Sequence, residues 1–196
     1  SVSDGFFADG YMLKANADGT YGATGPYAAK INSTGYATLK DALNASTASS
    51  TITLLKDVTV GEQLIIKAKK LDLNGKTLTS TYNMGSASGQ GRYALVNEVP
   101  LTIRNGTVAV DQARAIGGYA DLSLSKLNVT QKLTGGHACV AFCANDATYK
   151  ITSSTTIDGA YAVANFANNA TITIENSKIL GAGNALYHNG SNYGLK

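Results

Sequence analysis

The 196-residue sequence predicts an all-β protein, a right-handed parallel β-helix of about six turns with a short capping helix near its N-terminus. Composition is the first reason: charged residues make up only 15% of the chain, and 21 glycines accompany many Asn, Ser and Thr residues. Such a mixture is typical of many short strands joined by tight turns. The second reason is a short alternating apolar segment that recurs along the chain, as the units of a stacked solenoid do.

The recurring segment sets the predicted register of the turns. It begins at Ile52, Leu71, Leu101, Leu122, Tyr149 and Ile172, and a seventh copy begins at Leu195. The spacing varies, which a β-helix tolerates because insertions leave the stack as loops. A turn of about twenty residues buries only about five apolar side chains. Each buried side chain contributes ~1.5–3 kcal/mol, whereas ordering the backbone costs ~1–2 kcal/mol for every residue. One turn therefore cannot fold alone. The pattern therefore favours stacked strands over the alternative, a β-sandwich with coincidental spacing.

A second column supports the same alignment. Four residues before successive segments stand Asn97, Gly118, Asn145, Asn168 and Ser191. Asn and Gly tolerate the left-handed backbone conformation that a sharp corner requires. Two residues earlier in each turn stand Leu95, Ile116, Cys143 and Phe166. We expect this second set to form an inward-facing stack.

The parts of the chain before and after the repeats predict different structures. Residues 36–50 contain an amphipathic pattern with Thr38 as its N-cap, which predicts a short helix over the first turn. Residues 1–35 contain two Asp-Gly pairs and predict a hairpin-like segment. The β-helix then takes residues 51–196. Because no capping pattern follows Leu195, we expect this end to be truncated and the chain to be part of a longer protein.

Cys139 and Cys143 are the only cysteines. On one extended strand their Cα atoms would lie ~13 Å apart, whereas a disulfide requires about 7 Å or less. We therefore expect two small buried side chains. The alternative, a metal or redox pair, has only His137 nearby as a further ligand, so the sequence predicts no metal and no cofactor.

Three early segments carry a family resemblance. They read Tyr36-Ala-Thr-Leu-Lys-Asp-Ala-Leu, Thr51-Ile-Thr-Leu-Leu-Lys-Asp-Val and Leu71-Asp-Leu-Asn-Gly-Lys-Thr-Leu. Together with the Asp-Gly phrases that follow Phe7 and Asn16, they resemble β-helix modules of large adhesin-like surface proteins from gut Gram-positive bacteria. The resemblance covers most of residues 1–110. It implies that residues 1–35 end a preceding module, and that the parent protein is extracellular, attached to the cell surface, and adhesive or carbohydrate-binding.

The charged residues argue against two classes of partner and against an evident active site. The net charge of +3 is spread without the basic stripe that nucleic-acid binding requires, and no apolar run approaches the ~18 residues of a membrane span. The outward positions beside the first strand of each turn read Thr53, Asp72, Thr102, Ser123, Lys150 and Thr173. Glycoside hydrolysis needs two converging carboxylates, and this column has only one. We therefore expect a non-catalytic module, with a fragment of a polysaccharide lyase or glycoside hydrolase as the alternative.

The two longest insertions predict a ligand site. The first ends at Arg92 and Tyr93, and the second, residues 130–137, enters the repeat at a similar stage, so both should leave the solenoid on one side. Tyr82 and Tyr93 offer aromatic surfaces, and Arg92 and Arg114 offer hydrogen-bond donors, to host or dietary glycans or to surface proteins. Strand packing is the alternative role for the tyrosines. The predicted function is adhesion or glycan binding, or a rigid spacer.

Overall fold

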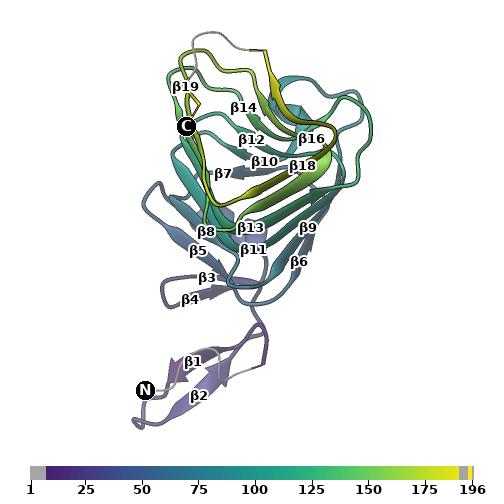
Figure 1. Ribbon diagram of the computed structural model, residues 1–196. Helices are drawn as coiled ribbons and strands as arrows, with labels where there is room; N and C mark the ends of the chain where they lie inside the picture. The colour runs from purple at the N-terminus through teal and green to yellow at the C-terminus, as the bar shows by residue number, and fades with distance from the viewer. Residues whose placement is uncertain (1–7, 190–193, 196) are drawn as a thin grey trace.

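The computed structural model describes residues 8–189 and 194–195, which form a parallel β-solenoid with a β-hairpin below it (Figure 1). β1 (Met12–Ala15) and β2 (Tyr21–Thr24) are this hairpin, and their antiparallel pairing agrees with the predicted one. β3 (Ala29–Ile31) and β4 (Thr34–Tyr36) form a second hairpin, which was not predicted from the sequence. β3 pairs antiparallel with the first solenoid strand, so the hairpin covers a sheet edge that would otherwise be open.

The predicted capping helix is confirmed as α1 (Leu39–Ala45). Its first turn is held by Thr38, whose Oγ1 accepts a 3.1 Å hydrogen bond from the Asp41 backbone N–H. This bond satisfies one of the N–H groups that the first turn of any helix leaves free. Leu39 and Ala42 are buried and belong to the main core, so the helix closes the apolar interior beside the first turn.

The solenoid has three faces, and each turn contributes one strand to each face. The first face stacks β5 (Thr51–Leu54), β8 (Lys70–Asp72), the beginnings of β11 (Leu101–Gln112) and β13 (Leu122–Gln131), β15 (Thr148–Thr152), β17 (Thr171–Ile174) and β19 (Gly194–Leu195). The second stacks β6 (Val58–Val60), β9 (Thr77–Asn83), the ends of β11 and β13, and the beginnings of β16 (Thr156–Asn165) and β18 (Lys178–His188). The third stacks β7 (Leu64–Ile66), β10 (Tyr93–Asn97), β12 (Arg114–Gly118), β14 (Ala138–Phe142) and the ends of β16 and β18. All these pairings are parallel, so the predicted solenoid of about six turns is confirmed and the β-sandwich alternative is wrong. We expect its winding to be right-handed, as parallel crossovers are.

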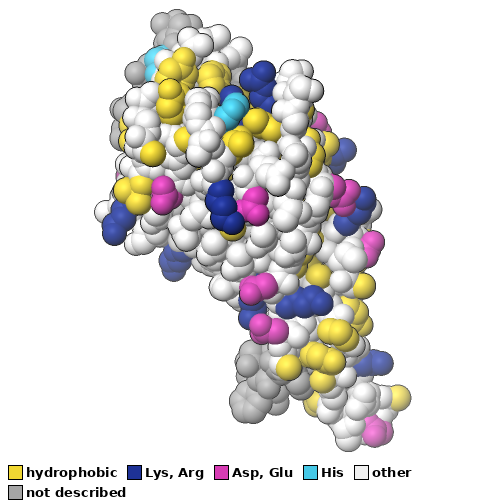
Figure 2. Space-filling model, turned by 90° about the vertical axis from the view of Figure 1, so that its right-hand side faces the viewer, with side chains coloured by type: hydrophobic (Ala, Val, Ile, Leu, Met, Phe, Trp, Pro, Cys, Tyr) yellow, Lys and Arg dark blue, Asp and Glu magenta, His cyan; other side chains and the backbone are white. Residues whose placement is uncertain are grey.

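The interior is one apolar core that follows the solenoid axis. One inward column contains Ile52, Leu71, Ile103, Leu124 and Ile151, which pair in that order from turn to turn and are 0% exposed. Each such side chain stabilises the fold by ~1.5–3 kcal/mol through burial. On the outer surface shown in Figure 2, Lys and Arg side chains lie scattered, several of them beside acidic ones.

The predicted register of the first face is correct except at one step. Leu71 pairs with Ile103, not with Leu101 as predicted. Because side chains alternate with a period of two, this shift of two residues keeps every side chain on its predicted face. It also sets Asp72 directly beside Arg104.

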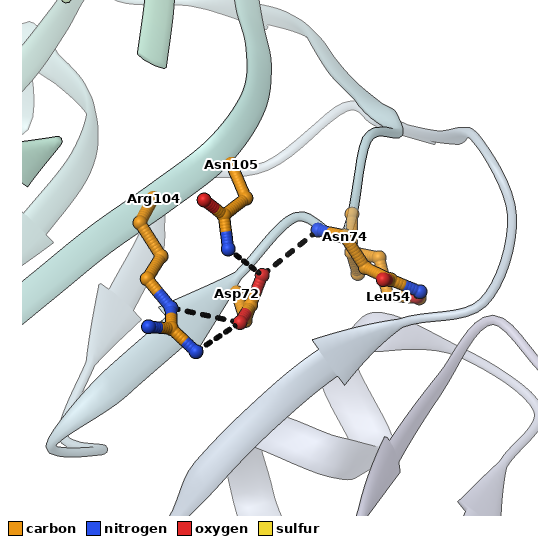
Figure 3. Close-up of polar contacts among 5 residues, drawn as sticks. All are labelled: Leu54, Asp72, Asn74, Arg104 and Asn105. Carbon is orange, nitrogen blue, oxygen red and sulfur yellow. Dashed lines mark hydrogen bonds and ion pairs between the residues drawn. The ribbon is translucent and has the colours of Figure 1, made fainter. Parts of the chain in front are cut away.

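The carboxylate of Asp72 joins these two turns (Figure 3). Its Oδ2 lies 2.6 Å from Arg104 Nη2 and accepts a 2.8 Å hydrogen bond from Nε, while its Oδ1 accepts bonds from the Asn105 side chain and the Asn74 backbone N–H. Asn74 Nδ2 in turn donates to the carbonyl of Leu54, one turn earlier. Asn74 and Asn105 both have left-handed backbones, with φ of 52° and 60°. The outward carboxylate of the first face therefore holds a corner together.

The second predicted column is correct for Asn97 and Gly118 and wrong after them. Gly118 pairs with Phe142, and Phe142 with Asn165, in place of Asn145 and Asn168. The inward stack is formed by Leu95, Ile116, Val140 and Val163, without Cys143 or Phe166. The reason is a longer corner in later turns, where left-handed residues stand at Asp146 and Asn169. The predicted position Ser191 lies outside the described residues.

Truncation of one inward side chain tests the stacked core. Leu124 is 0% exposed in a middle turn, so Leu124→Ala should lower the free energy of unfolding by about 3 kcal/mol through lost burial and the cavity left behind. The matched control is Ser123→Ala on the same strand, which faces outward and should change stability by less than about 0.5 kcal/mol. Urea unfolding followed by circular dichroism measures both. Equal effects of the two substitutions would contradict the inward placement of Leu124.

Candidate functional site

A groove follows the outer surface of the third face. In four successive strands of this face, β10, β12, β14 and the end of β16, two consecutive residues lie in the main core, as Ala94 and Leu95 do. After these residues, one column that faces away from the main core aligns Val96, Gly117, Ala141, Ala164 and Tyr187. Its three central members are Gly or Ala and are buried, and the rings of Tyr93 and Tyr119 pack over Gly117.

Two adjoining cavities lie in the groove, with volumes of about 260 and 290 Å³. Both are lined by Arg92, Arg114 and Phe166. The first is lined further by Gly89, Tyr93, Tyr119 and Cys143, and the second by Gly136, Ala138, Tyr161, Ala164 and Tyr187. Both predicted insertions reach the groove, through Gly89 and Gly136. The groove thus brings together Arg92, Tyr93 and Arg114 from the predicted site.

Arg114 is the charged centre of the groove. It begins β12, is only 8% exposed, and donates through Nη1 to the Tyr93 hydroxyl oxygen at 3.3 Å. Its Nε is buried and has no acceptor among the described residues, whose ion pairs also leave Arg114 out. A guanidinium has five N–H donors, and leaving a buried cation without a counter-charge costs free energy. The arrangement therefore suits an incoming anion.

Tyr93 positions Arg114 and is itself closed to solvent. It is 2% exposed, its ring centroid lies 5.7 Å from Arg114 Cζ, and its hydroxyl lies 3.8 Å from Cys143 Sγ. Burial, with a smaller effect of Cys143, raises the pKa of Tyr93, so the hydroxyl stays protonated at neutral pH. Gly117 makes room for the ring, because a Cβ at that position would lie 2.7 Å from Tyr93 Cγ. Tyr119 packs edge-on against Tyr93, with ring centroids 6.1 Å apart.

Arg92 adds a second positive charge at the rim. It ends a short 3₁₀ helix (Gly89–Arg92), and its Nε donates to the Ala87 carbonyl at 3.2 Å, which orients the side chain. The pKa of the neighbouring His137 is lowered. Burial is the largest cause, and the positive charges of Arg114 and Arg92 lower the pKa further. His137 is thus held neutral beside the two arginines.

Aromatic side chains form the far part of the groove. Tyr161 and Tyr187 lie nearly parallel, with ring centroids 5.9 Å apart and planes 24° apart. The ring centroid of Phe166 lies 6.0 Å from that of Tyr187. Phe166 and Tyr187 are 36% and 37% exposed, so part of each ring surface is free for contact.

The fourth predicted residue, Tyr82, has a different place. Its hydroxyl donates a 2.8 Å hydrogen bond to the Gly91 carbonyl, and its ring packs against the main core. Tyr82 lines neither cavity. It anchors the loop that carries Arg92, which makes it a supporting residue of the groove.

Several lining residues were missed because the predicted column was displaced. Cys143 and Phe166 were expected inside, but the longer corner turns both outward. Tyr119 and Tyr161 were not singled out. The signal that would have found them is local: Tyr119 stands two positions after the small residue Gly117, and Tyr161 stands three positions before the small residue Ala164.

No protein-family model, no curated protein and no solved structure matches this chain. Within the part of the chain that the structure describes, no helix is long and apolar enough to cross a membrane. The same residues bring together no group of three or more His, Cys, Asp or Glu side chains of the kind that holds a metal ion. The geometry of the groove is therefore the basis for the function proposed below.

Thiol labelling tests the geometry around the groove. Cys139 is fully buried and Cys143 partly buried, neither forms a disulfide, and burial raises the pKa of both thiols. At pH 8 both are therefore mostly protonated, and the thiolate is the reactive form. Mass spectrometry after iodoacetamide treatment should find Cys139 unmodified and Cys143 modified slowly, with rapid modification of both in urea. Rapid native labelling of Cys139 would contradict its position in the core.

Proposed function

We propose that this chain is a non-catalytic, glycan-binding module of an extracellular bacterial surface protein. The observation that carries the proposal is the groove, where partly exposed aromatic rings and two arginines line a cavity of about 290 Å³. Ligand sites are typically concave and mostly apolar, with a few placed polar groups. Sugar rings combine apolar C–H faces with hydroxyl groups, so they match such a lining.

The stacked architecture supports a role at a surface. About six turns at ~4.8 Å each give a rod roughly 29 Å long, stiffened by continuous strand pairing. Such a rod serves as a spacer while it presents a groove on its side. The resemblance of residues 36–78 to surface-protein modules agrees with this setting.

The placement of carboxylates favours binding over catalysis. Neither cavity is lined by Asp or Glu, whereas glycoside hydrolysis uses an acid and a base on either side of the scissile bond. Two outward aspartates have structural partners: Asp72 pairs with Arg104, and Asp111 with Lys132. The carbohydrate-active enzyme is therefore the weaker proposal.

Removal of the exposed rings tests glycan binding. The double substitution Phe166→Ala with Tyr187→Ala should weaken glycan affinity about tenfold or more, because each aromatic contact contributes roughly 0.5–1.5 kcal/mol. Tyr21→Ala is the matched control, since Tyr21 is 67% exposed on the distant β1–β2 hairpin. A glycan array selects the ligands, and calorimetry measures the affinities of the folded variants.

The same ligands then enter a cleavage assay. We expect intact glycans after long incubation, whereas release of products that depends on an acidic side chain would establish the enzyme alternative. Absence of binding to every glycan would leave only the spacer role. Equal loss of affinity in Tyr21→Ala and in the double variant would move the site away from the groove.

A further inference from the structure

We propose that the groove selects acidic glycans, binding the carboxylate of a hexuronate or sialate residue at Arg114 and Arg92 while the sugar ring packs against Tyr161, Phe166 and Tyr187. This inference rests on the proposed glycan-binding function and names its substrate class. It is independent of how the chain is attached to a cell.

The unfilled donors of Arg114 are the first argument. The residue is more than nine-tenths buried, yet its one hydrogen-bond acceptor is the neutral Tyr93 hydroxyl, and its Nε has no partner among the described residues. Charge-assisted bonds from arginine to carboxylate are short, frequently bidentate and about twice as strong as neutral ones. A ligand carboxylate would supply the counter-charge that the described part of the chain does not.

The space beside Arg114 is the second argument. Along this wall of the groove the outward residues of successive turns are Arg114, Ala138 and Tyr161, with Ala138 and Tyr161 directly paired. Adjacent turns are ~4.8 Å apart, so the backbone positions of Arg114 and Tyr161 are roughly 10 Å apart, with only the methyl group of Ala138 between them. The 290 Å³ cavity occupies this space. One end of a ligand there meets a cation, and the other end meets aromatic carbon.

The charge of the lining is the third argument. Arg92 reaches both cavities from its loop, no acidic residue lines either one, and the two arginines disfavour a proton on His137. A neutral sugar can accept hydrogen bonds from the two arginines but has no negative charge to pair with them. A carboxylated sugar uses both the charge and the rings, whereas inorganic anions use the charge alone.

Two matched ligand pairs test the inference. The folded chain is titrated by calorimetry with tri-galacturonate and its carboxyl-reduced counterpart, and with sialyllactose and lactose. At least one acidic ligand should bind tenfold or more tightly than its neutral partner, and its affinity should fall as salt is raised. The pair that shows the difference distinguishes hexuronate from sialate.

Charge variants locate the effect. Arg92→Ala should lower the affinity for the acidic ligand about tenfold. Arg114→Lys should lower it about ten- to hundredfold, because the lysine ammonium keeps the positive charge but lacks the planar pair of donors of a guanidinium. Arg92→Ala should weaken binding of neutral ligands less than binding of the acidic ligand, because a neutral sugar loses only a hydrogen-bond donor. Lys150→Ala is the control, since it removes an exposed cation from the first face, and it should leave affinity within twofold. Circular dichroism checks that each variant is folded.

The outcomes separate the two proposals. If acidic and neutral ligands bind equally tightly in both pairs, and the double variant Phe166→Ala/Tyr187→Ala binds them more weakly, carboxylate selection is overturned and glycan binding stands. Carboxylate selection is also overturned if the affinity for the acidic ligand is unchanged in Arg92→Ala and Arg114→Lys. No binding to any of the four ligands or to arrayed glycans would overturn both proposals.

Discussion

The structure depends on the contact between one turn and the next. The column from Ile52 to Ile151 is continuous through the core, and parallel strand pairing holds its members at a fixed spacing. No turn buries enough apolar surface to fold without its neighbours. The same constraint places outward residues of adjacent turns side by side, although they lie about twenty to thirty positions apart in sequence. A binding surface on such a fold is therefore built from columns, one residue per turn.

The groove arises where these columns change size. Gly117, Ala141 and Ala164 are small and buried along one line, and the larger side chains that line the cavities stand around them. Tyr93 and Arg114 lie on the cavity side of the third face, while Ala94 and Leu95 lie in the main core. Arg114 has a neutral partner, whereas Arg104 on the first face is paired with Asp72. Arg104 is therefore a structural cation, whereas Arg114, in the same turn, is suited to bind a ligand.

The sequence was sufficient to predict the solenoid, the capping helix and most of the first-face register, because alternation of apolar residues and the Thr38 cap are local signals. The two-residue shift at Leu71 was not predictable, since either pairing keeps the same faces buried. The longer corner after Phe142 displaced Cys143 and Phe166 from their predicted positions. The lengths of the insertions indicated that Arg92, Tyr93 and Arg114 lie on one side of the solenoid, where the structure places them. These lengths gave no information on exposure: Tyr93 is buried, and Tyr82 holds a loop.

Hydrogen–deuterium exchange with and without an acidic oligosaccharide tests the central claim most directly, because it reports stacking and ligand position in one measurement. The free chain should exchange slowest in the middle turns, β11 to β14, and faster in the β1–β2 hairpin. Ligand should slow exchange in β12, β14, the end of β16 and the loop that ends at Arg92, and should leave β15 on the first face unchanged. Protection centred on the hairpin or on the first face would contradict the account, and so would uniformly fast exchange in the middle turns.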